Sequence, residues 1–149
     1  MSYVYFITVT RRYSLLELNT AQVPIVYILS DSIGETAEVL VKAAASQFDS
    51  GHIDLRRVPY LVSTQQVEEA LLEAKESGGI VIYTLVRPDL KDFLKTKGQD
   101  FGLACVDVMG PVIDALKTVS HLPPKYEPGL IHKIDKDYFS KVEAIEFAV

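Results

Sequence analysis

The feature that most constrains the fold of this chain is an apolar run at residues 25–29 that ends at a polar turn. The run, IVYIL, is rich in β-branched residues and contains no charge, which is typical of a strand buried on both faces of a parallel sheet. Polarity changes at Ser30, and apolar residues then recur at helical spacing from Ala37 to Phe48. The sequence therefore predicts a buried strand that leads directly into a helix.

The turn at residues 30–36 joins the carboxyl end of this strand to the amino end of the helix, which is where open α/β sheets bind ligands. One interpretation of the turn needs no ligand. Ser32 and Glu35 have the spacing of a capping box, in which the Ser32 hydroxyl accepts from the Glu35 amide and the Glu35 carboxylate accepts from the Ser32 amide. Loss of such a cap costs about 1 kcal/mol, so capping alone explains these residue types.

The other interpretation of the turn is a functional site, because the amides and the dipole of a helix amino terminus attract phosphate. The residues expected to bind phosphate are Ser30, Ser32, Gly34 and Thr36. Two carboxylates, Asp31 and Glu35, repel a bare anion. They better suit a Mg²⁺ ion or a general base for a hydroxyl nucleophile. Asp31 is therefore the candidate catalytic base or metal ligand.

Strands and helices alternate along the rest of the chain. Apolar runs and helical periodicity predict strands at residues 53–58, 80–86 and 103–108, and helices that begin near Ser63, Pro88 and Gly110. Alternation at this spacing implies right-handed βαβ units. We therefore predict an α/β fold with an open, mainly parallel, Rossmann-like sheet and helices on both faces.

Shorter signals place individual residues within these elements. Ser63 and Gln66 again have the spacing of a capping box. Gly98 is expected beyond the end of the third helix, because glycine commonly follows a helix terminus. Arg56 and Arg57 within the second strand indicate a solvated strand edge.

Asp107 follows the last predicted strand as Asp31 follows the first. Because the carboxyl ends of parallel strands share one edge of a sheet, we expect both carboxylates near one cleft, with Asp107 as a subsidiary catalytic candidate. Cys105, the only cysteine, is interpreted as a buried inert thiol rather than a nucleophile. A single cysteine supports neither a disulfide framework nor a thiol-rich metal site, and no metal site is predicted from spacing.

Composition narrows the classes of function. The 149 residues suit one domain, and 48% apolar with 23% charged residues is ordinary for a soluble globular protein. Fifteen Lys and Arg against twenty Asp and Glu leave a net charge of −5, which argues against nonspecific binding to nucleic acid or anionic membrane. No apolar stretch reaches the roughly 18 residues of a membrane helix, and no secretory signal is evident. We expect a cytoplasmic protein.

The chain divides into three parts. Residues 1–24 are an appended segment without a catalytic role, interpreted as an edge strand, a partner-contacting arm or the product of an upstream start codon. Residues 25–122 form the α/β domain. Residues 123–149 are a loop and, from Asp135, a final helix. His132 in this loop is interpreted as a surface residue rather than a phosphate- or proton-transfer group, because no second histidine or cysteine lies at metal-ligand spacing.

Three segments carry a resemblance to a known family. They are YILSDSIGETAE at residues 27–38, DVMGPVIDAL at residues 107–116 and HKIDKDYFSKVEAIEFAV at residues 132–149. Together with the pattern between them, residues 25–149 resemble the amino-terminal part of the bacterial regulatory proteins of pyruvate, phosphate dikinase and phosphoenolpyruvate synthase. That family carries a nucleotide-binding P-loop downstream of the last segment. Neither GxxxxGK[ST] nor GxGxxG occurs in this chain, which we therefore expect to lead into a missing carboxyl-terminal P-loop domain.

The resemblance implies a bifunctional enzyme. Such an enzyme uses ADP to phosphorylate a threonine of a phosphotransferase whose catalytic histidine is already phosphorylated. It reverses the modification with inorganic phosphate and releases pyrophosphate. The SDSxGET turn is closer to the dikinase branch, so pyruvate, phosphate dikinase is the expected partner and phosphoenolpyruvate synthase the alternative.

The resemblance and the composition also set expectations for ligands and assembly. Mg²⁺ is compatible with the implied chemistry, no cofactor is expected to bind tightly here, and the isolated chain is expected to be inactive. A homodimer is compatible with the sequence. Two other functions stay open: a noncatalytic module that docks the target protein, and a phosphate-sensing α/β domain that uses residues 30–36.

Overall fold

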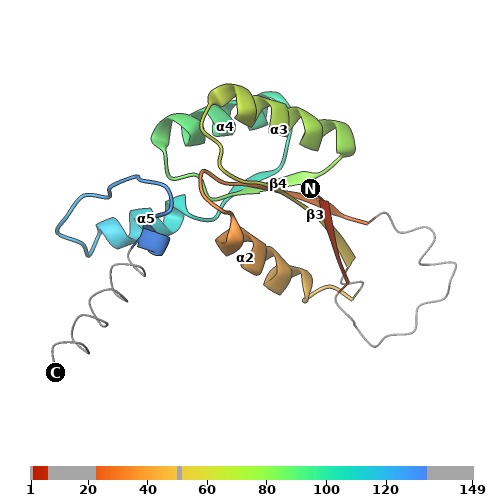
Figure 1. Ribbon diagram of the computed structural model, residues 1–149, viewed down its shortest axis with the longest axis horizontal. Helices are drawn as coiled ribbons and strands as arrows, with labels where there is room; N and C mark the ends of the chain where they lie inside the picture. Colours follow the sequence, from red (N-terminus) through yellow and green to blue (C-terminus); the bar gives the residue numbers. More distant parts are fainter. Residues whose placement is uncertain (1, 7–22, 50–51, 134–149) are drawn as a thin grey trace, which may run out of the picture.

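A five-stranded sheet with the strand order β1-β3-β2-β4-β5 organises the molecule (Figure 1). The computed structural model describes residues 2–6, 23–49 and 52–133. The strands are β1 (Ser2–Phe6), β2 (Ile25–Leu29), β3 (His52–Val58), β4 (Ile80–Tyr83) and β5 (Cys105–Asp107). β2 to β5 run parallel, and β1 pairs antiparallel with β3 at one edge.

Helices cover both faces of this sheet. They are α2 (Glu35–Ala45), α3 (Thr64–Ser77), α4 (Pro88–Asp100) and α5 (Gly110–Lys117). Figure 1 shows α3 and α4 above the sheet, α2 below it, and α5 beyond these two layers. The predicted open, mainly parallel α/β fold is confirmed. Residues 130–133 are already helical, so the loop predicted to reach residue 133 ends earlier, and the rest of the final helix expected from Asp135 lies outside the described residues.

β2 is the central strand, as its apolar run predicts. It lies between β3 and β4, and its residues Val26 to Leu29 are each at most 4% exposed. Val26 and Ile28 pack in the cluster on the α2 face, whereas Tyr27 and Leu29 pack in the cluster with α3 and α4. Full burial of each aliphatic side chain contributes about 1.5–3 kcal/mol, so the polar turn that follows β2 is fixed at the middle of the sheet's carboxyl edge.

The two arginines of β3 do not mark a solvated strand edge. That prediction is wrong because β1 pairs with β3 on the side away from β2. Arg56 donates from Nη1 to the Tyr27 hydroxyl at 2.7 Å and forms an ion pair with Asp54 at 2.9 Å. Arg57 forms an ion pair with Glu38 of α2. Both arginines therefore link β3 to its neighbours.

The amino terminus of α3 agrees with the capping signal read from the sequence. Ser63 is the N-cap, and its hydroxyl accepts from the Gln66 amide at 3.3 Å. The Gln66 side chain accepts from the amide of Val62, one residue before the cap, at 2.9 Å.

Gly98 lies inside α4 rather than beyond its end, which corrects the predicted helix boundary. A Cβ atom at Gly98 would lie 2.7 Å from the Cys105 Sγ atom, so the glycine allows β5 to approach α4. The helix instead ends before Gly102, which has a φ of 66°. The predicted strand at residues 103–108 is shorter, Cys105–Asp107. Burial raises the pKa of the Cys105 thiol, which supports its interpretation as an inert packing residue.

The contact between α4 and β5 gives a stability prediction. Gly98→Ala is expected to lower the free energy of unfolding by about 1–3 kcal/mol, the usual cost of overpacking, although alanine at an open helical site favours the helix by about 1 kcal/mol. Urea unfolding measures the difference. Adding Cys105→Ala removes Sγ and should recover most of the loss. A Gly98→Ala protein that is more stable than wild type would show that the contact relaxes freely.

Candidate active site at the carboxyl edge of the sheet

The turn after β2 does not form the predicted capping box. α2 begins at Glu35, so Ser32 lies too early to cap it, and the N-cap is Gly34 with a φ of 87° and no side-chain hydrogen bond to the helix amides. The Ser32 amide donates instead to the Ser30 hydroxyl at 3.0 Å. A left-handed backbone conformation at position 34 has a low free-energy cost only when the residue is glycine. The first turn of α2 therefore has no side-chain cap.

Ser30 holds this turn against the neighbouring strands. Its side chain is 2% exposed, and its hydroxyl accepts from the Ser32 amide and from the Thr84 hydroxyl, the latter at 3.1 Å. Its backbone amide donates to the Val58 carbonyl at the end of β3. Thr84 follows β4 and is 5% exposed. The ends of three adjacent strands are thus linked at Ser30, and its hydroxyl is a structural acceptor as well as a predicted phosphate ligand.

Asp31 braces the start of α4. Its carboxylate accepts from the amides of Val86 and Arg87 at 2.9 and 3.0 Å, and both bonds end on Oδ2. Arg87 is the N-cap of α4 and offers no side-chain cap of its own. The Asp31 side chain is 8% exposed and lines a cavity beside the turn. No hydrogen bond to Oδ1 is found among the described residues.

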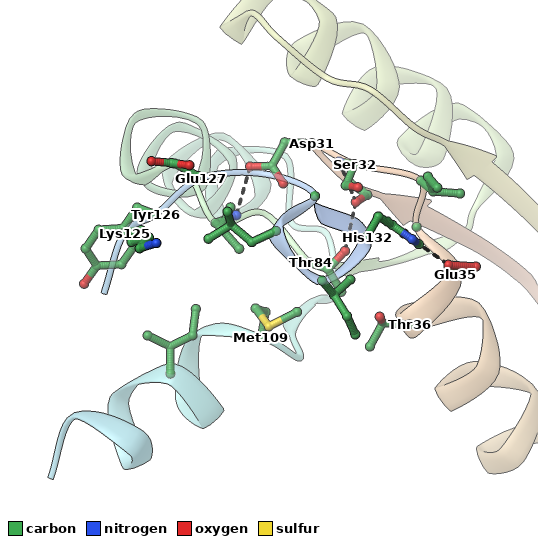
Figure 2. Close-up of a pocket in the computed structure, with 18 of the residues that line it drawn as sticks. Asp31, Ser32, Glu35, Thr36, Thr84, Met109, Lys125, Tyr126, Glu127 and His132 are labelled. Carbon is green, nitrogen blue, oxygen red and sulfur yellow. Dashed lines mark hydrogen bonds and ion pairs between the residues drawn. The ribbon is translucent and has the colours of Figure 1, made fainter. Parts of the chain in front are cut away.

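The cavity is open to solvent on one side and has a volume of about 650 Å³. It is lined by the turn after β2, the start of α2, the segment after β4, the start of α5 and the segment that follows α5. Figure 2 shows His132 reaching Glu35 at the start of α2, with Nε2 and Oε1 3.2 Å apart. Lys125 and Glu127 lie on the side away from this pair. All four predicted phosphate ligands line the cavity: Ser30, Ser32, Gly34 and Thr36.

Asp107 is not brought into this site. Its Oδ1 atom accepts from the amides of Met109 and Gly110 at 3.0 and 2.8 Å, and the residue is absent from the cavity wall. A Cβ atom at Gly110 would lie 2.2 Å from the Asp107 carboxylate, so the side chain is turned into the first turn of α5. Asp107 therefore does not line the cavity with Asp31, although Met109, two residues further along the chain, does. The carboxyl end of β5 does lie at the same edge of the sheet. The Asp107 carboxylate, however, accepts hydrogen bonds from the amides at the start of α5.

Sequence reasoning missed many residues of the cavity, among them the polar residues Thr84 and Lys125. Thr84 was assigned to the interior of an 80–86 strand, but β4 ends at Tyr83, so Thr84 stands at the same edge as Ser30. A polar residue interrupting an apolar run was the available signal. Lys125 lies in a loop without periodicity, and no local signal places it over the turn at residues 30–36.

The described residues contain no group of three or more His, Cys, Asp or Glu side chains arranged to hold a metal ion. Mg²⁺ usually keeps several waters and is held by one or two carboxylates with substrate phosphates, so Asp31 is a suitable contributor but not a complete site. Over the same described ranges, no helix is both long and apolar enough to cross a membrane.

Comparison with known proteins identifies the family of this chain. The sequence profile described as "Kinase/pyrophosphorylase" matches residues 26–149. The chain belongs to the kinase/pyrophosphorylase family. A protein of Carboxydothermus hydrogenoformans named "Putative pyruvate, phosphate dikinase regulatory protein" is 61% identical over 134 residues, which are 90% of this chain and 48% of that protein.

Further members of the kinase/pyrophosphorylase family show the same extent of similarity. A Syntrophomonas wolfei protein with the same name, numbered 2, is 53% identical over 85% of this chain and 46% of its own length. A Bacillus subtilis protein with that name is 46% identical over 84% of this chain and 47% of its own length. The chain spans about half the length of the curated relatives it matches.

The hydroxyl pair at the base of the turn gives the second prediction. Ser30→Ala removes the acceptor of two hydrogen bonds and leaves a buried donor unsatisfied, so the free energy of unfolding should fall by about 1–3 kcal/mol. Thr84→Val removes one of these bonds and should cost about 0.5–1.5 kcal/mol. Denaturant unfolding of both variants tests whether Ser30→Ala loses more stability than Thr84→Val. A larger loss for Thr84→Val would contradict the assignment of Ser30 as the shared acceptor.

Proposed function

We propose that this chain supplies the phosphate-binding turn and the general base of a bifunctional protein kinase and pyrophosphorylase. In the forward direction a threonine hydroxyl of pyruvate, phosphate dikinase takes the terminal phosphoryl group of ADP, and AMP leaves. In the reverse direction inorganic phosphate removes that group as pyrophosphate and restores the hydroxyl. The family description and the names of the relatives support this proposal; phosphoenolpyruvate synthase is the alternative target.

The observation that carries the proposal is the uncapped amino terminus of α2 beside the Asp31 carboxylate on one cavity wall. Helix amides without a side-chain cap, together with the helix dipole, favour a phosphate group. Thr36 in the first turn and Ser32 before it add hydroxyl donors at the same wall. A phosphoryl group and the hydroxyl that receives it can therefore be held within one cavity.

Asp31 is suited to be the general base of this reaction. Phosphoryl transfer requires a positioned group near the attacking hydroxyl and cationic groups near the transferred one. The two backbone amides fix Oδ2 of Asp31, so Oδ1 is held in a defined position to accept the threonine proton. The carboxylate therefore combines a structural and a chemical role.

Lys125 is the candidate for cationic stabilisation within the described part of the chain. It lines the cavity, and its ammonium group suits the negative charge of a transferred phosphoryl group. His132 is engaged by Glu35 at the rim. The acidic residues of the wall, Asp31, Glu35 and Glu127, disfavour a free anion unless further positive charge arrives with the substrate or from elsewhere in the protein.

Two other functions are separated by titrating the 149-residue chain with inorganic phosphate, ADP and pyruvate, phosphate dikinase. If the chain binds the dikinase but no longer protein that contains it phosphorylates the dikinase, the result supports a docking module. Binding of phosphate alone, with no affinity for the dikinase, supports a phosphate sensor that uses the same uncapped helix. Catalysis itself is tested in a chimera that joins this chain to the remaining half of the Carboxydothermus hydrogenoformans relative.

The chimera also tests the role of Asp31. Asp31→Asn keeps the size of the side chain and an oxygen for the Val86 and Arg87 amides but removes the charge. Dikinase phosphorylation should fall by about 10²-fold or more, the usual scale for a general base, with little change in melting temperature. Asp107→Asn is the matched control, because that carboxylate faces α5, and its rate per folded molecule should match wild type. Full activity of folded Asp31→Asn would end the catalytic assignment.

The isolated chain is expected to bind ADP more weakly than a micromolar dissociation constant, which corresponds to about −8 kcal/mol. The turn contains a single glycine, Gly34, so its backbone cannot wrap a diphosphate, and three carboxylates line the cavity. Isothermal titration calorimetry measures the affinity directly. Micromolar binding by the 149-residue chain would reveal a nucleotide site that this geometry does not explain.

A further inference from the structure

Tyr60 combines two unfavourable features beside the active-site turn. Its φ is 57°, in the left-handed region that residues with bulky side chains rarely adopt, and 62% of the residue is exposed to solvent. Tyr126 is the other non-glycine residue with positive φ among those described, but it is less exposed and lies under the Lys117 ammonium, 5.7 Å from the ring centroid. The Tyr60 ring has no comparable cover among the described residues.

Hydrogen bonds to the turn explain how this backbone conformation is maintained. The Tyr60 amide donates to the Ser32 carbonyl and the Leu61 amide to the Ser30 carbonyl, each at 3.0 Å. Leu61 is 3% exposed and packs in the core cluster with α3 and α4. The loop after β3 is therefore anchored on both sides of Tyr60, and the tyrosine is held in a fixed position relative to the active-site turn.

Val62 extends the same exposed surface. It is also 62% exposed. Both polar groups of its backbone form hydrogen bonds: the amide donates to the Gln66 side chain at 2.9 Å, and the carbonyl accepts from Arg87 Nη1 at 3.0 Å. Two apolar side chains thus project from either side of the buried Leu61. Backbone strain that persists because surrounding contacts enforce it is concentrated at functional sites.

We propose that Tyr60, supported by Val62, is a specificity residue that contacts the surface of the protein substrate next to the threonine that enters the cavity. This inference rests on the proposed function. Neither side chain lines the cavity, so a small anion inside it does not reach them, whereas a folded protein that presents a hydroxyl to Asp31 must cover the cavity rim. A preorganised tyrosine is a typical binding hot spot, because its large amphipathic ring loses little conformational freedom on binding.

The test compares the affinity of pyruvate, phosphate dikinase for the 149-residue chain and three variants. Tyr60→Asn removes the ring and suits a left-handed backbone, so the protein should fold with an unchanged or higher melting temperature while the dissociation constant rises about tenfold or more. Tyr60→Phe keeps the ring and should bind within about threefold of wild type. Phe48→Asn is the matched control: Phe48 is 69% exposed beyond the carboxyl end of α2, away from the turn, and its loss should not change binding.

Each outcome decides the inference. Equal affinities of wild type and Tyr60→Asn would show that Tyr60 does not contact the dikinase, and an equal loss in Phe48→Asn would show that the effect is not specific to this loop. A wild-type chain that does not bind the dikinase would also refute the inference. The proposed function is judged separately, by phosphorylation of the dikinase in the chimera. If Tyr60→Asn instead weakens ADP binding and leaves dikinase affinity unchanged, the ring serves the nucleotide and the inference is wrong.

Discussion

The structure depends on the burial of β2 at the centre of a parallel sheet. Because both faces of this strand are covered by helices, its register relative to β3 and β4 is fixed, and the carboxyl ends of the three strands meet at one edge. The Ser30 amide binds the end of β3, while its hydroxyl accepts from Thr84 after β4. Apolar packing thus determines where a small set of polar atoms converges, beside the start of α2, whose N-cap Gly34 makes no side-chain hydrogen bond.

The polar atoms to which we assign a chemical role also have structural roles. Asp31 fixes the start of α4 through one carboxylate oxygen, and the residue also lines the cavity. Catalytic groups act well when neighbouring contacts hold them in one geometry, so bracing and proton transfer are compatible in one side chain. Asp107 shows the contrast, since its carboxylate serves the amides of α5 and lies outside the cavity.

The turn at residues 30–36 also connects two surfaces of different character. Its residues line the cavity, which is where we propose that a phosphoryl group binds. Its carbonyls, through Ser30 and Ser32, hold the loop that exposes Tyr60 and Val62. Under the proposed function, the covalent chain would couple the position of the phosphoryl group to the surface that the protein substrate meets. Such coupling would restrict which hydroxyl reaches Asp31.

The sequence by itself determined the fold class, the central place of β2 and the candidate turn. The reason is that continuous apolar runs indicate strands buried on two faces, and apolar residues at helical spacing indicate helices. The sequence did not determine the capping of α2, since the left-handed conformation of Gly34 moves the helix start beyond Ser32. It also misplaced Gly98, whose missing side chain matters only because Cys105 of another element lies beside it. Only the tertiary structure brought Thr84 and Lys125 to the cavity and kept Asp107 away from it. The physical reason is that contacts between distant segments depend on strand order and packing of the whole sheet, which no local pattern encodes.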